Sequence, residues 1–291
     1  MKTKSVKTAF ILEIKALFSS MRTYLYIAAI LLFSLVYTVY FGIYRGDPSL
    51  THTLSYLSLP IILAAPLITA QSFAGERERD RMLISFGENS LSLLIGRLSA
   101  VLVLGISPLI PLLFVPIALS SLGSISYLSD YLGIFSLALF CLAYLSALVL
   151  ISVCCASKKL CYVLSYAFAV LSYLIDIAVS LLPVNAFALT CAVVLINASF
   201  CAGLYRFTKS ITVSATVFSA LTVLLCAVSN FATSFAHRII KAVLRFTAPC
   251  SALGDLLHGE LFDLTAMLCL IIFTVFCVLT AFICLEKRRT E

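Results

Sequence analysis

The chain contains eight long apolar runs, each long enough to cross the hydrocarbon core of a bilayer. A spanning helix needs about 20 apolar residues, because the core is about 30 Å thick and a helix rises about 1.5 Å per residue. The runs occupy residues 23–44, 53–74, 98–121, 130–156, 160–182, 186–205, 211–235 and 262–285. The sequence is 62% hydrophobic and 11% charged, whereas soluble domains are about half apolar and a quarter charged. A soluble globule is excluded. The runs predict an all-α polytopic integral membrane protein with about eight transmembrane helices, in which residues 1–291 form a single transmembrane domain.

The distribution of basic residues predicts the orientation of these spans. If the spans alternate from a cytoplasmic N-terminus, sixteen of the 20 Lys and Arg residues lie inside. The four outside are Arg45, Arg238, Lys241 and Arg245. This bias fits the positive-inside rule and places both termini in the cytoplasm of a multi-pass protein. The net charge of +7 is therefore a topology signal, and we expect no nucleic-acid partner.

Residues 1–22 predict an amphipathic helix at the cytoplasmic membrane surface. An apolar stripe repeats at helical spacing through Phe10, Ile14, Leu17 and Met21, with Lys4, Lys7 and Lys15 largely off that stripe. Such a helix is too charged to insert and lies in the interface. It either anchors the first span to membrane lipid or offers a docking surface to a cytoplasmic partner, and the sequence favours neither reading.

Five of the eight prolines lie in the second and third spans, at Pro60, Pro66, Pro108, Pro111 and Pro116. Proline removes a helix hydrogen bond and bends the axis, and membrane helices tolerate it where neighbours satisfy the freed carbonyls. The two spans are therefore expected to be bent and movable. The alternative is that proline is simply commoner in membrane helices than in soluble ones.

The loop of residues 75–97, between the second and third spans, is the most charged part of the chain. Its charges alternate in sign from Glu76 to Arg81, and an apolar cluster follows at Met82, Leu83, Ile84 and Phe86. The loop is much longer than a tether requires, and it exposes apolar side chains beside charges on the cytoplasmic side. We interpret it as a docking element for a soluble partner, with an ordinary interfacial loop as the alternative. Residues 236–261 predict a second amphipathic segment, on the outer surface.

The sequence carries no recognisable catalytic equipment. No phosphate-binding loop of the G-x-x-x-x-G-K-[ST] type occurs, and neither H-E-x-x-H nor G-x-S-x-G is present. The eleven cysteines include no Cys-x-x-Cys pair, so we interpret them as small apolar fillers rather than a disulfide framework or a zinc site. The protein is therefore not expected to be an enzyme, and no catalytic residue, cofactor site or metal site is assigned.

Two polar residues inside predicted spans are functional candidates. Asp176 is a carboxylate in the fifth span, and such groups are costly in lipid and functional by default. It stands six residues before Leu182, about 9 Å from the outer end of the helix, so a structural role near the interface is as plausible as a role in transport. Asn197, in the sixth span, is a candidate for lining a pathway.

The order of several motifs along the chain resembles the ABC-2 type permeases, particularly the gliding-motility and copper-enzyme-maturation branch. In that family an amphipathic helix with an acidic-basic pair and a Phe-Ser-Ser step precedes the first span, as in FILEIKALFSS, Phe10 to Ser20. SFAGER, Ser72 to Arg77, is similar to the family's exit from the second span, and Met82 to Ile84 and Gly96-Arg97 match the following elements in kind. The family's Gly-Thr and Ser-Pro elements are absent here. The last span, which ends in a basic cluster, also resembles the family.

The resemblance implies the membrane-spanning permease subunit of an ATP-binding-cassette exporter in the plasma membrane. It implies a second permease subunit, in a homodimer or a heterodimer, and separately encoded ABC ATPase subunits that bind ATP and Mg. The implied ATPase-coupling residues are Glu76, Arg77, Glu78, Arg79, Arg81, Met82, Leu83 and Phe86. The implied residues of the N-terminal interface helix are Phe10, Glu13, Lys15 and Phe18. Because shorter members have six spans, residues 186–205 and 211–235 look like an insertion seen in longer relatives.

Two other functions remain open at this point. One is a proton-coupled secondary transporter that uses Asp176. The other is a membrane scaffold that transports nothing. No second carboxylate and no Lys or Arg lies at the depth of Asp176 to build a proton relay, which weighs against the first.

Overall fold

The computed structural model describes residues 2–46, 49–73, 90–121, 126–155, 157–180, 249–250, 253, 256 and 264–290. Every element in this part of the chain is a helix. The elements are α1 (Lys2–Phe18), α2 (Met21–Thr38), η1 (Val39–Tyr44), α3 (Thr51–Ser72), α5 (Ser90–Ile106), η2 (Ser107–Phe114), α6 (Val115–Leu119), α7 (Tyr127–Cys154), α8 (Lys158–Ser180) and α13 (Leu264–Thr290). Segment η1 is a π-helix that continues α2, and η2 is a 3₁₀ segment.

Five helices of the described chain are long and apolar enough to cross a membrane. They are Met21–Tyr44, Thr51–Ser72, Ile95–Leu119, Tyr127–Cys154 and Ala266–Glu286. They coincide with the first four and the eighth of the predicted spans, so a helical membrane protein is confirmed, although not the count of eight. Helix α8 coincides with the fifth predicted span but is not among the five. The sixth and seventh spans, 186–205 and 211–235, and nearly all of segment 236–261 lie outside the described residues.

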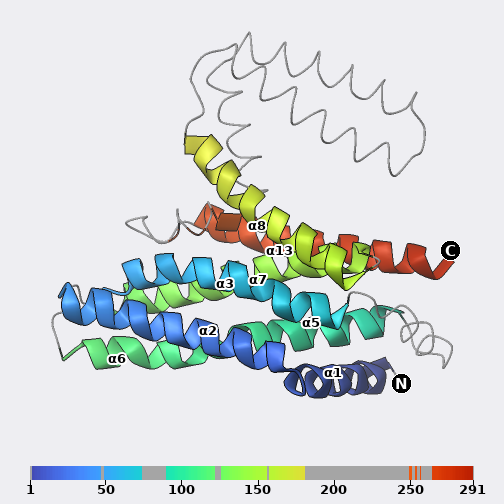
Figure 1. Cartoon of the computed structure of the whole chain (residues 1–291), viewed down its shortest axis with the longest axis horizontal. Helices are drawn as coiled ribbons and strands as arrows, with labels where there is room; N and C mark the ends of the chain where they lie inside the picture. Colours follow the sequence, from blue (N-terminus) through green and yellow to red (C-terminus); the bar gives the residue numbers. More distant parts are fainter. Residues whose placement is uncertain are drawn as a thin grey trace, which may run out of the picture. The chain divides into compact units, whose positions relative to one another are not determined.

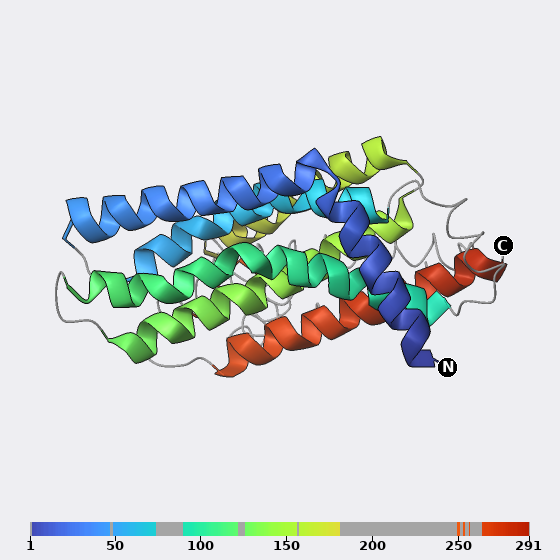
Figure 2. The ribbon, with the colours of Figure 1, turned by 90° about the horizontal axis from the view of Figure 1, so that it is seen from below.

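The chain divides into two units, residues 1–172 with 249–291 and residues 173–248. In the first unit, α3 and α7 form the centre, because 67% of the apolar window of each is buried, against 28% for α2 and 22% for α13. Helix α7 packs against α13, α3 and α5, and α2 packs against α3 (Figure 1). The chain's two termini lie at the same end of this unit (Figures 1 and 2). Of the second unit, the described residues are 173–180, the last turns of α8.

The peripheral helices bury only one stripe each. The stripe on α2 is Thr23, Tyr26, Ile30 and Ser34. The stripe on α13 includes Met267, Leu270, Phe273, Cys277 and Ala281. Both follow the spacing of three or four residues that puts side chains on one helix face. Their other faces carry large apolar side chains such as Leu32 and Phe276, which are 59% and 57% exposed and suit lipid contact.

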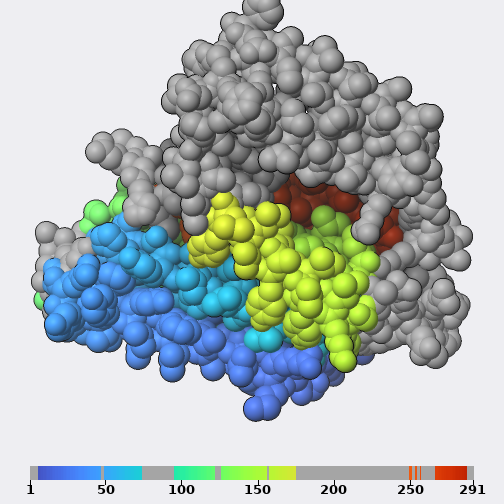
Figure 3. Space-filling model, turned by 45° about the horizontal axis from the view of Figure 1, so that its top comes forward, coloured from blue at the N-terminus to red at the C-terminus, as the bar shows by residue number. Residues whose placement is uncertain are grey.

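The beginning of α8 lies beside α3 in the first unit. The Tyr166 hydroxyl donates to the carbonyl oxygen of Leu63 on α3, at 3.2 Å. Phe168 stacks on Tyr144 of α7 with ring centroids 5.9 Å apart. In Figure 3 the first turns of α8, drawn yellow-green, cover part of α3. Aromatic side chains thus join α8 to both central helices.

Three tyrosines donate hydrogen bonds to carbonyls that proline leaves without a backbone partner. Proline has no N–H, so the carbonyl four residues earlier in an α-helix, or three earlier in a 3₁₀ segment, loses its donor. Tyr144 donates to the Ile62 carbonyl at 3.4 Å, four residues before Pro66. Helix α3 continues through both of its prolines, so the second span keeps its helical winding, and the expected bend stays a prediction.

The third span changes to 3₁₀ winding from Ser107 to Phe114, a segment that contains Pro108 and Pro111. Pro108 frees two carbonyls: the Ser107 hydroxyl donates to Leu104 at 2.8 Å, and the Tyr26 hydroxyl donates to Gly105 at 2.8 Å. Tyr131 similarly donates to Leu113 at 3.4 Å, three residues before Pro116. Side-chain hydroxyls therefore replace backbone donors that water cannot replace inside a membrane.

A carboxylate caps the central helix α3 at the end of the bundle away from the two chain termini. Asp130 of α7 is 3% exposed and accepts a hydrogen bond from the Leu50 backbone N–H at 3.1 Å. Leu50 immediately precedes α3, whose first N–H groups have no partner within the helix and carry a partial positive charge. The carboxylate thus stabilises the start of α3 and ties it to α7.

We predict that Tyr26→Phe destabilises the protein by about 1 to 2 kcal/mol, because it removes the best-placed donor to the Gly105 carbonyl inside the membrane. Tyr24→Phe is the matched control: Tyr24 lies on the same helix and is 56% exposed, so its change should be close to neutral. Thermal unfolding in detergent micelles measures both. Equal stability of the two variants would contradict the proposed role of the Tyr26 hydroxyl.

Candidate functional site

Helix α1 crosses obliquely at one end of the bundle, where it packs against α5 and touches α2 and α3 (Figure 2). The face it buries is Ala9, Glu13 and Leu17, which are 8%, 3% and 1% exposed. This face shares Leu17 with the predicted stripe but differs from it at the other positions. Phe10 and Ile14 lie at the edge of the buried face, and Met21 belongs to α2 and is 83% exposed. The buried face centres instead on a charged residue.

Gly96 of α5 allows α1 to approach closely. A Cβ atom at this position would lie 2.7 Å from the Ala9 Cβ and 3.0 and 3.1 Å from backbone atoms of Val6 and Phe10. Backbone atoms cannot move aside as a flexible side chain can, so any side chain at this position pushes the helices apart. The small residues Ala9 and Gly96 together set the distance at which Glu13 meets α5.

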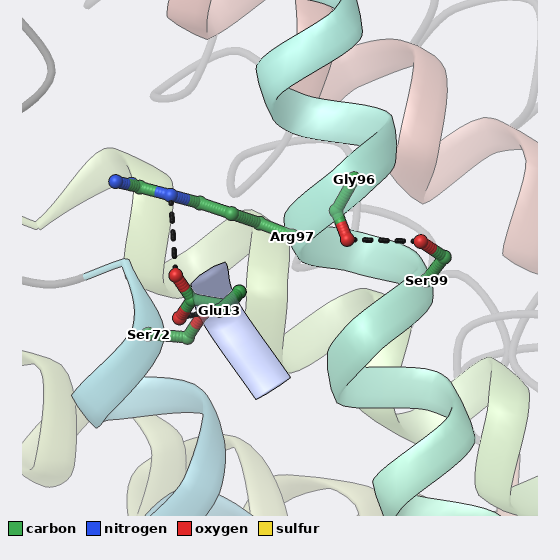
Figure 4. A network of polar contacts seen from close by, with 5 residues as sticks. All are labelled: Glu13, Ser72, Gly96, Arg97 and Ser99. Atoms are coloured by element: carbon green, nitrogen blue, oxygen red, sulfur yellow. Dashed lines mark hydrogen bonds and ion pairs between the residues drawn. The ribbon is translucent and has the colours of Figure 1, made fainter. Parts of the chain in front are cut away.

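Glu13 is the centre of a buried polar network that joins three helices (Figure 4). One carboxylate oxygen, Oε2, lies 3.5 Å from Nε of Arg97 on α5. The other, Oε1, accepts a hydrogen bond from the Ser72 hydroxyl at the end of α3, at 2.5 Å. Figure 4 shows the carboxylate of α1 between the side chains of the other two helices. The network thus links α1, α3 and α5 by directional contacts.

The network buries two charged side chains, and this burial costs free energy unless the charges are compensated. Arg97 is 2% exposed, and its guanidinium carbon lies 5.9 Å from the centre of the Phe73 ring, over its face. A charge taken out of water costs several kcal/mol unless an opposite charge and hydrogen bonds compensate it. Glu13 and Arg97 therefore depend on each other, and separating α1 from α5 would leave two buried charges without their compensation.

Two further contacts tie the junction of α1 and α2 to the same end of the bundle. The Ser20 side chain accepts from the Arg22 backbone N–H, which caps α2, and its hydroxyl donates to Oε1 of Gln71 on α3 at 2.6 Å. Nη1 of Arg22 donates to the Tyr162 hydroxyl on α8 at 2.8 Å. The serine-rich turn after α1 is thus bound to the end of α3 and to the first turns of α8.

The outer face of α1 is apolar and cationic. Ile11, Leu12 and Phe18 are 41%, 46% and 44% exposed, and Lys7 and Lys15 are exposed beside them. Glu13, the only acidic residue of α1, points to the bundle. Of the residues predicted for the N-terminal interface helix, Lys15 and Phe18 thus face outward, Phe10 lies at the edge and Glu13 faces inward.

The predicted coupling residues from Glu76 to Phe86 lie outside the described part of the chain, as does Asn197. Asp176 lies on the helical backbone of α8, and its side chain is not described. The structure does define both ends of the predicted 75–97 loop: α3 ends at Ser72, and α5 already begins at Ser90. Both ends are joined to Glu13 of α1, through Ser72 and Arg97.

Arg97 is the functional candidate that the sequence analysis missed, because its place beside an apolar run made it look like a solvated loop charge. A signal was present. Glu13 is the only acidic residue among the first 46, and a lone carboxylate on an interfacial helix needs a basic partner when it is buried.

Within the described residues, no group of three or more His, Cys, Asp or Glu side chains is placed to hold a metal ion. Comparisons with models of protein families, with curated proteins and with solved structures find no match.

We predict that substitutions of Glu13 and Arg97 lower the free energy of unfolding by amounts that do not add. Glu13→Gln or Arg97→Met alone leaves one buried charge and should cost about 3 to 5 kcal/mol. The double variant removes both charges and should be more stable than either single variant. Denaturant unfolding in micelles measures the stability of the unaltered chain, the two single variants and the double variant, which together form a double-mutant cycle. The control is Lys15→Gln at an exposed position, which should change stability by less than about 0.5 kcal/mol. A double variant whose loss equals the sum of the single losses would refute the coupling.

We also predict that Gly96→Ala loosens α1. The new Cβ meets the backbone of α1, whereas the matched change Gly42→Ala meets chiefly the flexible end of Leu119. Limited proteolysis of the N-terminal 20 residues should therefore be faster in Gly96→Ala than in Gly42→Ala. Equal rates would show that the close approach at Gly96 does not hold α1 in place.

Proposed function

We propose that this chain is the membrane-spanning permease subunit of an ABC-2 type exporter in the plasma membrane. The observation that supports the proposal most is the buried Glu13–Arg97 pair, which lies 3.5 Å across the interface of α1 and α5. Together with the hydrogen bond from Ser72 to Glu13, it joins α1 to the helices at both ends of the 75–97 loop, so the three would move as one rigid unit. Such a unit is what a permease needs if a separate motor is to drive it.

The motor would be a separately encoded ABC ATPase that binds ATP and Mg. Apolar side chains of Met82, Leu83 and Phe86 would fill a groove on the ATPase, and the alternating charges of Glu76 to Arg81 would set the register of docking. A displacement of this segment reaches Ser72 on one side and Arg97 on the other. Because both residues contact Glu13, α1 and the adjoining ends of α3 and α5 would move together.

The pathway would open by a change between two arrangements of the spans. The third span is suited to absorb such a change. Its α5 portion is fixed to α1 through Arg97, and the 3₁₀ segment Ser107–Phe114 follows. In and just before that segment, hydroxyl groups donate to the Leu104, Gly105 and Leu113 carbonyls, and such single bonds would exchange more easily than a continuous helical ladder. A second permease subunit, identical or not, would complete the pathway.

The two faces of α1 support a division of labour in this proposal. The inner face carries Glu13 and transmits motion within the permease. The outer face, with Lys15 and Phe18, would contact either the lipid headgroups or the ATPase, and its cations and apolar groups suit an anionic membrane surface.

The test is co-purification of ATP hydrolysis with the full chain from membranes of its own host. We expect the preparation to contain a second protein with a phosphate-binding loop and to hydrolyse ATP. Changing Met82, Leu83 and Phe86 to serine should remove most of both. The matched control changes Tyr127 and Leu128, which are 47% and 76% exposed at the other end of the bundle, to serine and should leave both intact. Hydrolysis that survives the triple change, or is absent from the unaltered preparation, would overturn the proposal.

A further inference from the structure

Two cysteines that are far apart in the sequence meet at the ends of α7 and α13. The sulfur atoms of Cys154 and Cys284 lie 3.9 Å apart. Cys154 is the last residue of α7, and Cys284 lies on the part of α13 that follows the buried stripe. Both are thiols in the structure, Cys154 exposed and Cys284 half-buried. As apolar fillers they would be buried like Cys141 and Cys161, and Cys154 is not.

The pair also lies at the end of the bundle where the chain's basic residues gather. Lys158 and Lys159 begin α8, four and five residues after Cys154, and are exposed. In the sequence, Glu286 and then Lys287, Arg288 and Arg289 follow Cys284, so basic residues outnumber acidic ones near both cysteines. This excess of positive charge would attract an anionic reagent. The predicted topology places this end in the cytoplasm, where thiols are kept reduced at rest.

We propose that Cys154 and Cys284 form a site of thiol–disulfide exchange, which takes an anionic low-molecular-weight disulfide as its substrate and closes to a bond between α7 and α13. The Cys154 thiolate attacks one sulfur of the reagent, R–S–S–R, and releases one thiol as the leaving group. The Cys284 thiolate then attacks the Cys154 sulfur of the mixed disulfide and releases the second. The two cysteines lose two protons and two electrons, and the reagent is reduced to two R–SH molecules.

The order of attack follows from exposure. Cys154 is reached from solvent and reacts first, whereas Cys284 is half-buried and needs only a short movement to reach the mixed disulfide. A disulfide bond requires sulfur atoms about 2 Å apart, so the 3.9 Å separation closes by side-chain rotation and a small shift of α13. This bond would fix α13 to the helix at the centre of the bundle.

The test treats the full chain in detergent with glutathione disulfide, alkylates the remaining thiols with N-ethylmaleimide and maps the peptides by mass. Two variants separate the steps. In the unaltered chain, Cys154 and Cys284 should escape alkylation and appear in one pair of cross-linked peptides. Dithiothreitol should reduce the disulfide and separate the two peptides. Cys284→Ser should retain one glutathione at Cys154, because the resolving thiol is missing. Cys154→Ser should lose the cross-link and slow the modification of Cys284 at least tenfold.

Cys277→Ser is the matched control, because Cys277 lies on α13 but is buried, and this variant should close as the unaltered chain does. The proposal is overturned if the cross-linked peptide does not form. It is also overturned if Cys154 pairs instead with its neighbour Cys155, or if Cys284→Ser carries no glutathione at Cys154.

Discussion

The structure depends on one constraint, which is that the hydrocarbon of a bilayer offers no hydrogen bonds. Every backbone polar group placed there must find its partner within the protein. Backbone groups are satisfied by winding into helices, and the proline positions show what happens where winding fails. Tyr26, Tyr131 and Tyr144 come from neighbouring helices to donate to freed carbonyls. Because each donor belongs to a different helix from its acceptor, satisfying the backbone also joins the bundle together.

Burial inside the protein has a similar effect on Glu13 and Arg97, which act as one unit. At the surface an ion pair contributes little, because water and salt compete for both charges. Here both side chains are nearly inaccessible to solvent. Burying the two charges costs about as much free energy as their attraction returns, so the pair adds little to the stability of the fold. Moving α1 alone would break the attraction, and this movement is therefore costly. The pair therefore serves specificity of arrangement more than stability. It selects one position of α1 over the ends of α3 and α5, and Gly96 makes that position sterically accessible.

Much of the architecture could be predicted from the sequence, because apolar length is a direct requirement of crossing a membrane. Runs 23–44, 53–74, 98–121, 130–156 and 262–285 each coincide with a helix that can span. The buried face of the N-terminal helix could not be predicted by the same reasoning. Hydrophobic periodicity does not say which charged residue of an interfacial helix is buried, so it gave Glu13 no orientation and left Arg97 in a loop. Pairing between residues that are distant in the sequence depends on the tertiary structure, and the periodicity within one helix carries no information about it. The tyrosine donors were missed for the same reason, although the need for such donors followed from the prolines.

These contacts give the third span two unlike parts in series. At one end, Arg97 and Gly96 fix α5 to α1, and the α-helix continues to Ile106. From its last turn onward, Pro108, Pro111 and Pro116 interrupt the hydrogen-bond ladder, and hydroxyl groups of Ser107 and of tyrosines on other helices donate to carbonyls there. A regular helix transmits an axial displacement almost unchanged, because its hydrogen bonds run parallel to the axis. The interrupted segment can instead change its winding by exchanging one hydroxyl donor for another, at about the free energy of a single hydrogen bond. A force applied near Arg97 would therefore produce rearrangement mainly at Ser107–Phe114, in the middle of the span, rather than at the point where it is applied.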